Sequence, residues 1–317
     1  MTAFHDTALL TLIGGVLALL IVASLIGWTL SRRTLSPSGR ATVDNINARI
    51  RAWWVMASVF VIAVATGGAG SILLFALLSW LALREFVTLA PTSRGDHRAL
   101  FWCFFIVTPL QYYLVWVGWY DLFVKLIPVY VSIFLAVRIV LAGDTERFLE
   151  RVATMQWGLL VCVYFVSYVP ALLTLHIPTF ENQDARLVFF LVAVVQLSDV
   201  LQYVWGKSLG RHHIAPAISP NKTWEGFVGG ILSATALGTA IWWATPFTPA
   251  QAALMAFLIT LTGFSGGLIM SAIKRDRRVK DFGALIEGHG GILDRIDSLC
   301  FAAPVFFHLT RYFFAAR

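Results

Sequence analysis

Charged side chains are scarce in this 317-residue sequence. Asp, Glu, Lys and Arg make up 13% of it, and hydrophobic residues make up 58%, whereas a soluble domain contains about 25% charged residues. A chain with so few charges cannot cover the surface of a water-soluble fold of this size. The composition excludes a soluble enzyme and a disordered chain, and it predicts an all-α, polytopic helical membrane protein.

Cysteine is also rare. The three cysteines, Cys103, Cys162 and Cys300, each lie inside an apolar run. Small apolar side chains in such runs are typical of buried packing positions. This usage excludes a secreted disulfide scaffold and favours neither a disulfide nor a zinc site.

Apolar runs of about 20 residues, the length that crosses a bilayer, recur along the whole chain. The second run is short and is followed by a glycine-rich turn at Gly67–Gly70. We therefore expect ten spans, or nine if the second and third fuse. The expected spans are 7–30, 52–67, 70–90, 99–118, 122–142, 155–175, 186–205, 226–245, 250–272 and 298–315.

Positive charge is concentrated in alternate loops. The net charge is +7, which in a membrane protein does not indicate a nucleic-acid partner. Most of the 24 Lys and Arg residues fall in five loops, at 31–51, 91–98, 143–154, 206–225 and 273–297. Cytoplasmic loops of membrane proteins are enriched in Lys and Arg. We therefore expect these loops to face the cytoplasm and the N-terminus to lie outside.

The loop at 206–225 and the helix before it carry the first group of candidate site residues. Asp199 lies inside an apolar span, where an ionisable side chain is costly and usually functional; a salt-bridged structural carboxylate is the alternative. Ser219, Asn221, Lys222 and Thr223 form a turn before a helix start. Hydroxyls, backbone N–H groups and a lysine suit a phosphate, although a capped loop beside lipid headgroups would look similar.

The loop at 273–297 mixes both signs of charge at high density. A loop that only bound anionic lipid would not need carboxylates, whereas a polyphosphate with Mg²⁺ needs both signs. If a helix begins near Asp294, the carboxylates of Asp294 and Asp297 share one face. Glycines there would let the backbone approach a ligand closely. The other candidates in this loop are Lys274, Arg275, Lys280, Asp281, Gly288, His289, Gly290, Gly291 and Arg295.

These residues resemble a family signature. The spacing from Ser271 to Asp297 is similar to that of phosphatidate cytidylyltransferases, also called CDP-diacylglycerol synthases. The region of Asp199, the stretch Ser219–Gly226 and the short segment Leu83–Phe86 resemble other motifs of that family. The signature reads Ser271-x-Ile-Lys274-Arg275-x4-Lys280-Asp281-x-Gly283-x-x-Ile-x-Gly288-His289-Gly290-Gly291-Ile-x-Asp294-Arg295-Ile-Asp297.

Two positions depart from the family pattern. Glu287 stands where the family usually has proline, and Asp199 is followed by Val200-Leu201-Gln202 instead of the commoner Thr-Gly-Ala. The chain therefore resembles a divergent bacterial branch. The acceptor lipid is more in question than the chemistry, because the acidic positions of the signature are retained.

The resemblance implies a reaction and a site. The reaction is the metal-assisted condensation of CTP with phosphatidate to CDP-diacylglycerol and pyrophosphate, at the cytoplasmic face of a bacterial inner membrane. The implied metal ligands for Mg²⁺, alone or with a second cation, are Asp294, as the leading ligand, and Asp199, Asp281 and Asp297. The implied catalytic side chains, besides Asp294 and Asp281, are Lys222, Lys280, Arg295 and His289. The implied substrate-binding residues are Ser219, Asn221, Thr223, Lys274, Arg275, Gly288, Gly290 and Gly291.

The same interpretation divides one integrated membrane domain into two parts. Residues 1–185 would supply helices that line a lipid-side cavity, and residues 186–317 would form the catalytic region. The interpretation leaves open whether the protein forms a homodimer. Another lipid phosphate as acceptor and a non-catalytic homologue are alternatives. An ion-coupled transporter is a third, since Glu85 and Asp199 lie within spans. However, the charge density lies in loops and no inverted repeat is visible.

Overall fold

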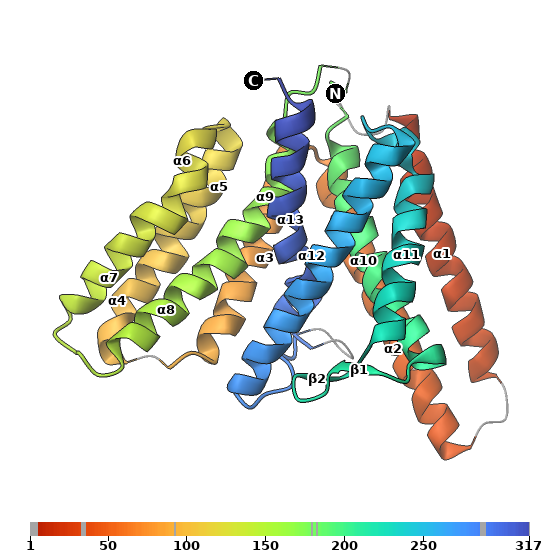
Figure 1. Cartoon of the computed structure of the whole chain (residues 1–317), viewed down its shortest axis with the longest axis horizontal. Helices are drawn as coiled ribbons and strands as arrows, with labels where there is room; N and C mark the ends of the chain where they lie inside the picture. Colours follow the sequence, from red (N-terminus) through yellow and green to blue (C-terminus); the bar gives the residue numbers. More distant parts are fainter. Residues whose placement is uncertain are drawn as a thin grey trace.

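The computed structural model is a bundle of long helices, as predicted (Figure 1). It describes residues 6–32, 36–91, 93–178, 180–181, 183–285 and 290–316, except for the side chains at positions 37, 38 and 94. Within these residues, eight helical segments are long and apolar enough to cross a membrane. The prediction of an all-α polytopic membrane protein is therefore confirmed.

The N-terminal part consists of three separate α-helices followed by three composite helical rods. In each rod a π-helical turn, which accommodates one extra residue, joins two α-helices; the turns are at 103–107, 126–131 and 160–165. The helices are α1 (Thr7–Ser31), α2 (Pro37–Ala65), α3 (Gly68–Thr88), α4 (His97–Trp102), α5 (Thr108–Val117), α6 (Tyr120–Lys125), α7 (Ser132–Val140), α8 (Phe148–Leu159) and α9 (Val166–Ala171).

The C-terminal part contains four long helices and a small β-hairpin. The helices are α10 (Ala185–Leu209), α11 (Trp224–Ala240), α12 (Pro249–Asp276) and α13 (Leu293–Phe314). The hairpin pairs β1 (His213–Ala215) with β2 (Ser219–Thr223) in antiparallel register. The sequence predicts a turn and a helix start here, but it does not reveal these short strands. Thr223 ends β2 and also caps α11, because its side-chain oxygen accepts a hydrogen bond from the Gly226 N–H.

Several predicted helix boundaries differ from the structure by four residues or more, and the largest difference is at the start of α2. α2 begins at Pro37 and not at residue 52, so Arg40, Arg49 and Arg51 lie on a helix and not in a loop. A serine N-cap at Ser36 followed by proline is a strong helix start, and this local signal outweighs the polarity of the segment. α12 likewise continues beyond the predicted end at residue 272, to Asp276.

The other predicted spans correspond to helices of the bundle. Gly67, with a φ of +83°, separates α2 from α3, so the second and third spans do not fuse. The predicted spans 226–245 and 298–315 correspond to α11 and α13. These two helices pack within the bundle, but they are not among the eight helices that are both long enough and apolar enough to cross a membrane. α11, for example, has only 17 residues.

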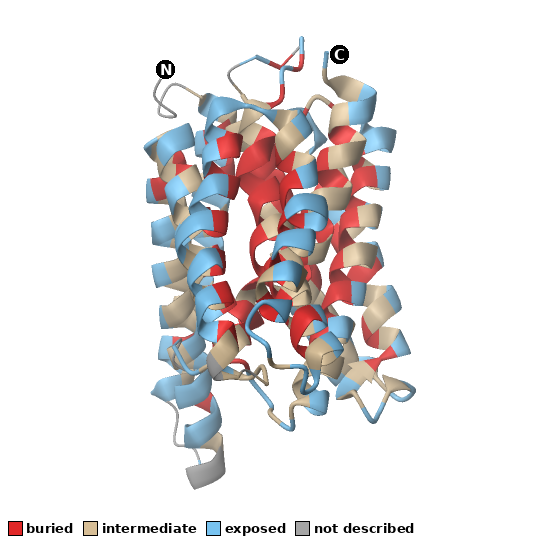
Figure 2. Cartoon of the chain, turned by 90° about the vertical axis from the view of Figure 1, so that its left-hand side faces the viewer, coloured by how far each residue is buried: buried red, intermediate tan, exposed pale blue. Residues whose placement is uncertain are grey.

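The connections between helices separate by charge. α1 begins and α13 ends at one end of the bundle, whereas the five basic connections gather at the other end (Figure 1). The core lies between the helices, and the outer faces are exposed (Figure 2). The hairpin lies at the basic end, beside α10, α11 and α12. The structure therefore brings both predicted polar loops to one end of the molecule.

Candidate active site

Lys222 extends from the hairpin into the bundle. Its ammonium nitrogen lies 4.5 Å from the centroid of the Phe264 ring on α12. One turn further along α12, the absence of a side chain at Gly267 makes room for it, since a Cβ there would lie 2.9 Å from Lys222 Nζ. The same Cβ would lie 3.4 Å from the Ser298 hydroxyl on α13. The lysine charge is therefore held between the hairpin, α12 and α13.

Two carboxylates, Asp199 on α10 and Asp297 on α13, share a partner near this lysine. The Ser298 hydroxyl donates to Asp199 Oδ1 at 3.2 Å, and the Ser298 backbone N–H donates to Asp297 Oδ1 at 2.8 Å. The charges of both carboxylates act on Lys222. We call Asp199, Lys222 and Asp297 the Lys222 centre.

The Lys222 centre contains no closed ion pair. Within the described residues, no cation lies within 4.0 Å of either carboxylate, and Lys222 donates no hydrogen bond. Burial lowers the pKa of the Lys222 ammonium, although Asp199 and Asp297 oppose that shift. Three charged groups thus lie close together and keep most of their bonding capacity free.

A second group, around Lys274, is closed. Lys274 Nζ on α12 donates to Asp294 Oδ1 at 2.8 Å. The backbone N–H groups of Phe282 and Gly291 donate to Asp294 Oδ2 at 2.8 and 2.9 Å. We call Lys274, Asp294 and these two amides the Lys274 centre. Because the Asp294 side chain is only 3% exposed, it joins α12, the segment after it and α13 from the inside.

Gly290 packs against this centre in a conformation that favours glycine. Its φ is +82°, and a Cβ on it would lie 2.9 Å from Asp294 Oδ2 and 3.3 Å from Asp281 Cβ. A side chain there would press on both acidic residues while straining its own backbone. Here the backbone of Gly290 closely approaches acidic side chains of the protein itself, and its position shows that Asp281 lies beside Asp294.

The structure brings only some of the predicted site residues together. Asp199, Lys222 and Asp297 meet, Lys274 and Asp294 pair, and the charge of Arg295 acts on Asp199 and Asp297. α13 begins at Leu293, five residues before the predicted span 298–315, so the condition for Asp294 and Asp297 to lie in the first turns of one helix is met.

The remaining predicted residues lie outside both centres. Asn221, Lys280 and Asp281 are exposed, and Ser219 is half-buried in β2. Arg275 is exposed and ties α12 to its surroundings, through hydrogen bonds to the backbone carbonyls of Ile218 and Val279. Three further residues lie outside the described part of the chain: Gly288, His289 and Glu287, which departs from the family pattern.

Magnesium is the metal that the family resemblance implies. Within the described part of the chain, no group of three or more His, Cys, Asp or Glu side chains has metal-binding geometry. Mg²⁺, however, usually takes one or two protein carboxylates and completes its shell with water and substrate phosphates. Asp199 and Asp297 fit that pattern because each has an oxygen that accepts no hydrogen bond from the described residues. Asp294 fits it less well, since both of its oxygens already accept hydrogen bonds.

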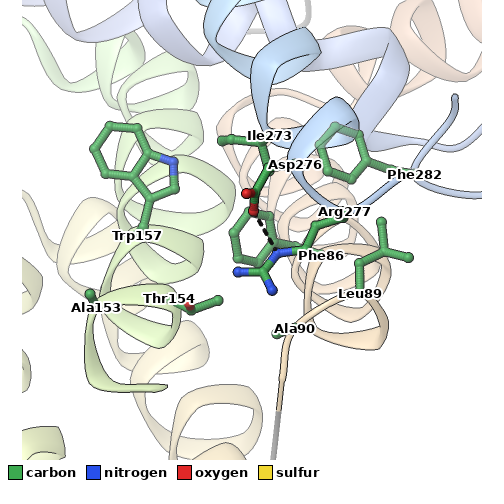
Figure 3. Close-up of a pocket in the computed structure, with 10 residues that line it drawn as sticks. All are labelled: Phe86, Leu89, Ala90, Ala153, Thr154, Trp157, Ile273, Asp276, Arg277 and Phe282. Atoms are coloured by element: carbon green, nitrogen blue, oxygen red, sulfur yellow. Dashed lines mark ion pairs between the residues drawn. The ribbon is translucent and has the colours of Figure 1, made fainter. Parts of the chain in front are cut away.

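An apolar cavity of about 320 Å³ adjoins the Lys274 centre. It lies between α3, α8 and α12, and Phe86, Trp157, Ile273 and Phe282 supply much of its lining (Figure 3). Arg277 lies in this cavity and pairs with Asp276 at 3.2 Å. Phe282 belongs to both the cavity and the Lys274 centre, because its ring lines the cavity and its backbone N–H donates to Asp294.

Sequence reasoning missed two residues of the site. Ser298 was not among the predicted site residues. It directly follows Asp297, and this position was the available signal that its polar groups could contact a carboxylate. From the sequence, Glu85 was interpreted as a partner of Arg84 beside a lipid-side cavity or, in the transporter alternative, as an intramembrane carboxylate. In the structure Arg84 is exposed, and Glu85 instead accepts hydrogen bonds from the backbone at the start of α13.

The fold and the two charge centres define a helical membrane protein with a charged site at one end, and comparison with known proteins places it in a family. Residues 47–313 match the model of the cytidylyltransferase family. The chain belongs to this family, which confirms the resemblance inferred from the signature.

Individual relatives fall into two groups. The chain is 41% identical to the uncharacterized protein YnbB of Escherichia coli strain K12 over 297 residues, which cover 93% of this chain and 96% of YnbB. It is 38% identical over 146 residues to the phosphatidate cytidylyltransferase of Mycobacterium leprae, which is 45% of this chain and 46% of that protein. The corresponding Bacillus subtilis protein is 38% identical over 44% of this chain and 52% of its own length. The match to these two cytidylyltransferases thus spans about half of their length.

Proposed function

We propose that the protein transfers a cytidylyl group from CTP to a lipid phosphate, with phosphatidate as the substrate. An oxygen of the phosphatidate phosphate attacks the α-phosphorus of CTP. The bond from that phosphorus to the oxygen bridging to the β-phosphate breaks. The products are CDP-diacylglycerol and pyrophosphate, so atoms and charge balance without a further reactant.

The observation that carries this proposal is the open charge cluster at the Lys222 centre. In a member of the cytidylyltransferase family, two carboxylates and a lysine from α10, α13 and the hairpin converge without closing an ion pair. All three residues are half-buried, and a charge that is partly withdrawn from water without an ion-pair partner is costly. A polyphosphate with its divalent cation would provide partners for all three groups at once.

The attacking group needs little activation. A phosphate monoester has a second pKa of about 6 and is already an oxyanion at neutral pH. The main difficulty is to bring two polyanions together in line. The Lys222 ammonium would neutralise a phosphate at the reacting end, and Arg295 and the basic residues of the segment after α12 would add positive charge around it.

Asp199 and Asp297 would hold Mg²⁺. Held there, Mg²⁺ would supply positive charge that offsets the charge of the CTP phosphates and of the leaving pyrophosphate. Ser298 would fix the two carboxylates relative to each other by donating to both. Asp294, about one turn before Asp297 on α13, would keep Lys274 and the Gly291 turn in position.

The membrane setting follows from the same arrangement. The glycerol and acyl part of the lipid would lie toward the apolar cavity beside Phe282, and its phosphate would reach the charged end of the bundle. CTP and Mg²⁺ would enter from the cytoplasm, since the basic connections lie at this end. We therefore assign the protein to a bacterial inner membrane with its site facing inward.

The test uses the full chain purified in detergent. It is incubated with labelled CTP, Mg²⁺ and, in parallel, phosphatidate, lysophosphatidate, a polyprenyl phosphate or no lipid. We expect a labelled lipid and one equivalent of pyrophosphate, with the highest kcat/KM for phosphatidate and no product without Mg²⁺. Labelled product with another lipid phosphate alone would change the acceptor but keep the reaction. Absence of nucleotidyl transfer to every lipid would refute the proposal.

A further inference from the structure

We propose that Glu85 of α3 is a positioning residue for the site, because it fixes the start of α13 and thereby the placement of Asp294 and Asp297. This inference rests on the proposed function. Glu85 itself lies outside both charge centres. It acts through the backbone of residues that the sequence places more than 200 positions away.

The carboxylate of Glu85 binds the first amides of α13. Its Oε1 accepts the Ile292 N–H at 3.0 Å, and its Oε2 accepts the Leu293 N–H at 2.9 Å. The first N–H groups of a helix have no partner within that helix, and negative charge is favourable there. Residue 292, immediately before α13, makes no side-chain cap of its own. A carboxylate from a different helix thus caps the helix that carries the acidic residues.

The Glu85 carboxylate has no competing cationic partner in the part of the chain that the structure describes. Within the described residues, no Lys, Arg or His lies within 4.0 Å of its carboxylate. An ionisable side chain near the end of a membrane-spanning helix is costly unless its hydrogen bonds are satisfied. The two amides of α13 therefore account for the presence of a charged residue at this position.

Two glycines allow the contact. A Cβ at Gly283 would lie 2.6 Å from Glu85 Oε1, and a Cβ at Gly291 would overlap Glu85 Oε2. The segment between α12 and α13 thus approaches the carboxylate at two points where only glycine fits. The next residue of α3, Phe86, stacks on Phe282 with ring centroids 6.3 Å apart, and both rings line the cavity in Figure 3.

Glu85 and Asp294 divide the backbone donors of one turn between them. Asp294 takes the Gly291 N–H, and Glu85 takes those of Ile292 and Leu293. Asp294 therefore holds this turn from the side of the site, and Glu85 holds it from α3. If the Glu85 side chain no longer offered two acceptor oxygens, the first turn of α13 would be free to shift. Asp297 would then move relative to Asp199 on α10.

The first experiment compares Glu85→Gln and Glu85→Asp with Arg84→Gln, a change at an exposed neighbour on the same helix. A glutamine side chain presents its NH₂ group to one of the two amides, so one hydrogen bond is lost. We expect kcat to fall by about 10- to 100-fold, the usual effect of disturbing a group that orients site ligands. The KM for CTP should change little, and half-maximal activity should need more Mg²⁺. Glu85→Asp, which keeps both acceptor oxygens, should retain more activity than Glu85→Gln, and Arg84→Gln should match the wild type.

A second variant reaches the same contact from the other side. Gly283→Ala leaves Glu85 unchanged but drives a methyl group against its carboxylate, and it should lower kcat in the same way. Gly14→Ala is the matched control, because a Cβ at Gly14 meets no atom within 4 Å. A loss in Gly283→Ala with wild-type behaviour of Gly14→Ala supports the proposal even if Glu85→Gln fails to fold.

Hydrogen exchange on the unmodified protein provides a test that is independent of catalysis. The Ile292 and Leu293 amides should exchange slowly in the wild type, unlike uncapped first-turn amides, and faster in Glu85→Gln. Fast exchange in the wild type, or a wild-type kcat and Mg²⁺ requirement in Glu85→Gln, would overturn the proposal. Failure of the proposed function would look different, since the wild type itself would then be inactive while the exchange pattern persisted.

Discussion

The two lysine–aspartate groups at the charged end of the bundle differ in how completely they are satisfied. At the Lys274 centre, Asp294 accepts from one ammonium and two backbone N–H groups. At the Lys222 centre, two carboxylates and an ammonium share a neighbourhood, but no ion pair forms. The same residue types therefore serve two purposes. The closed group holds the chain together, and the open group is available to a ligand.

The difference arises from where the donors come from. The Phe282 and Gly291 amides lie on the segment that leads into α13, so the loop itself can fold back around Asp294. Asp199 and Asp297 lie on separate helices. Among the residues that the structure describes, only the Ser298 hydroxyl donates to Asp199 and only the Ser298 backbone N–H donates to Asp297. A carboxylate pair held by so few donors repels itself and therefore favours a cation between its members.

The largest effect should follow from removing a carboxylate of the Lys222 centre. We expect Asp199→Asn and Asp297→Asn each to lower kcat by about 10³-fold or more, the scale of losing a principal electrostatic contact. The midpoint of thermal unfolding without Mg²⁺ should stay the same or rise, because one of two repelling charges is gone. Activity and melting are measured on the same detergent preparation. A variant that is both active and less stable would indicate a structural role instead.

The Lys274 centre should respond in the opposite way. Lys274→Met leaves the buried Asp294 charge without its cation, which should lower the free energy of unfolding by about 3–5 kcal/mol. Adding Asp294→Asn removes that unpaired charge, and it should restore much of the lost stability. Denaturant titration of the two single variants and the double variant measures this coupling. Additive losses would show that the two side chains do not form the ion pair.

Lys222 should be important for turnover and unimportant for folding. Lys222→Met removes a half-buried ammonium that has no ion-pair partner among the described residues and leaves an apolar side chain to pack on the Phe264 ring, so we expect stability close to that of the wild type. The loss of a phosphate contact should reduce kcat by about 10²-fold. Comparison with Lys274→Met in the same two assays distinguishes the centres. If Lys222→Met and Lys274→Met lowered stability equally, the Lys222 centre would not differ from the Lys274 centre in being open.

The smallest effect should come from Gly290→Ala. A φ of +82° strains any other residue, and this strain should cost about 1–2 kcal/mol of stability. The added methyl group would also press on Asp294 Oδ2, so activity should fall modestly as well. Gly14→Ala, in open space on α1, should show neither change in a thermal melt or a turnover assay. A fully stable Gly290→Ala variant would show that the turn can relax away from Asp294.

Much of the architecture could be predicted from local patterns. Apolar runs located the helices, and the asymmetry of Lys and Arg located the basic connections. The spacing of Asp294 and Asp297 predicted a shared face on condition that a helix began there. These properties depend on residues close together in the chain, which is why composition and periodicity reveal them. The start of α2 was missed because its Ser36-Pro37 capping signal precedes a polar stretch, which led us to expect a loop.

The roles within the site required the tertiary structure. The sequence by itself determined a helical membrane protein with a cluster of opposite charges near its C-terminal end, and the family signature followed from the same residues. Only packing decided that Asp294 closes the Lys274 centre while Asp199, Lys222 and Asp297 remain open, and that Glu85 caps α13. The reason is physical: each of these contacts joins segments far apart in the chain, and no local periodicity specifies which donors will reach a given carboxylate.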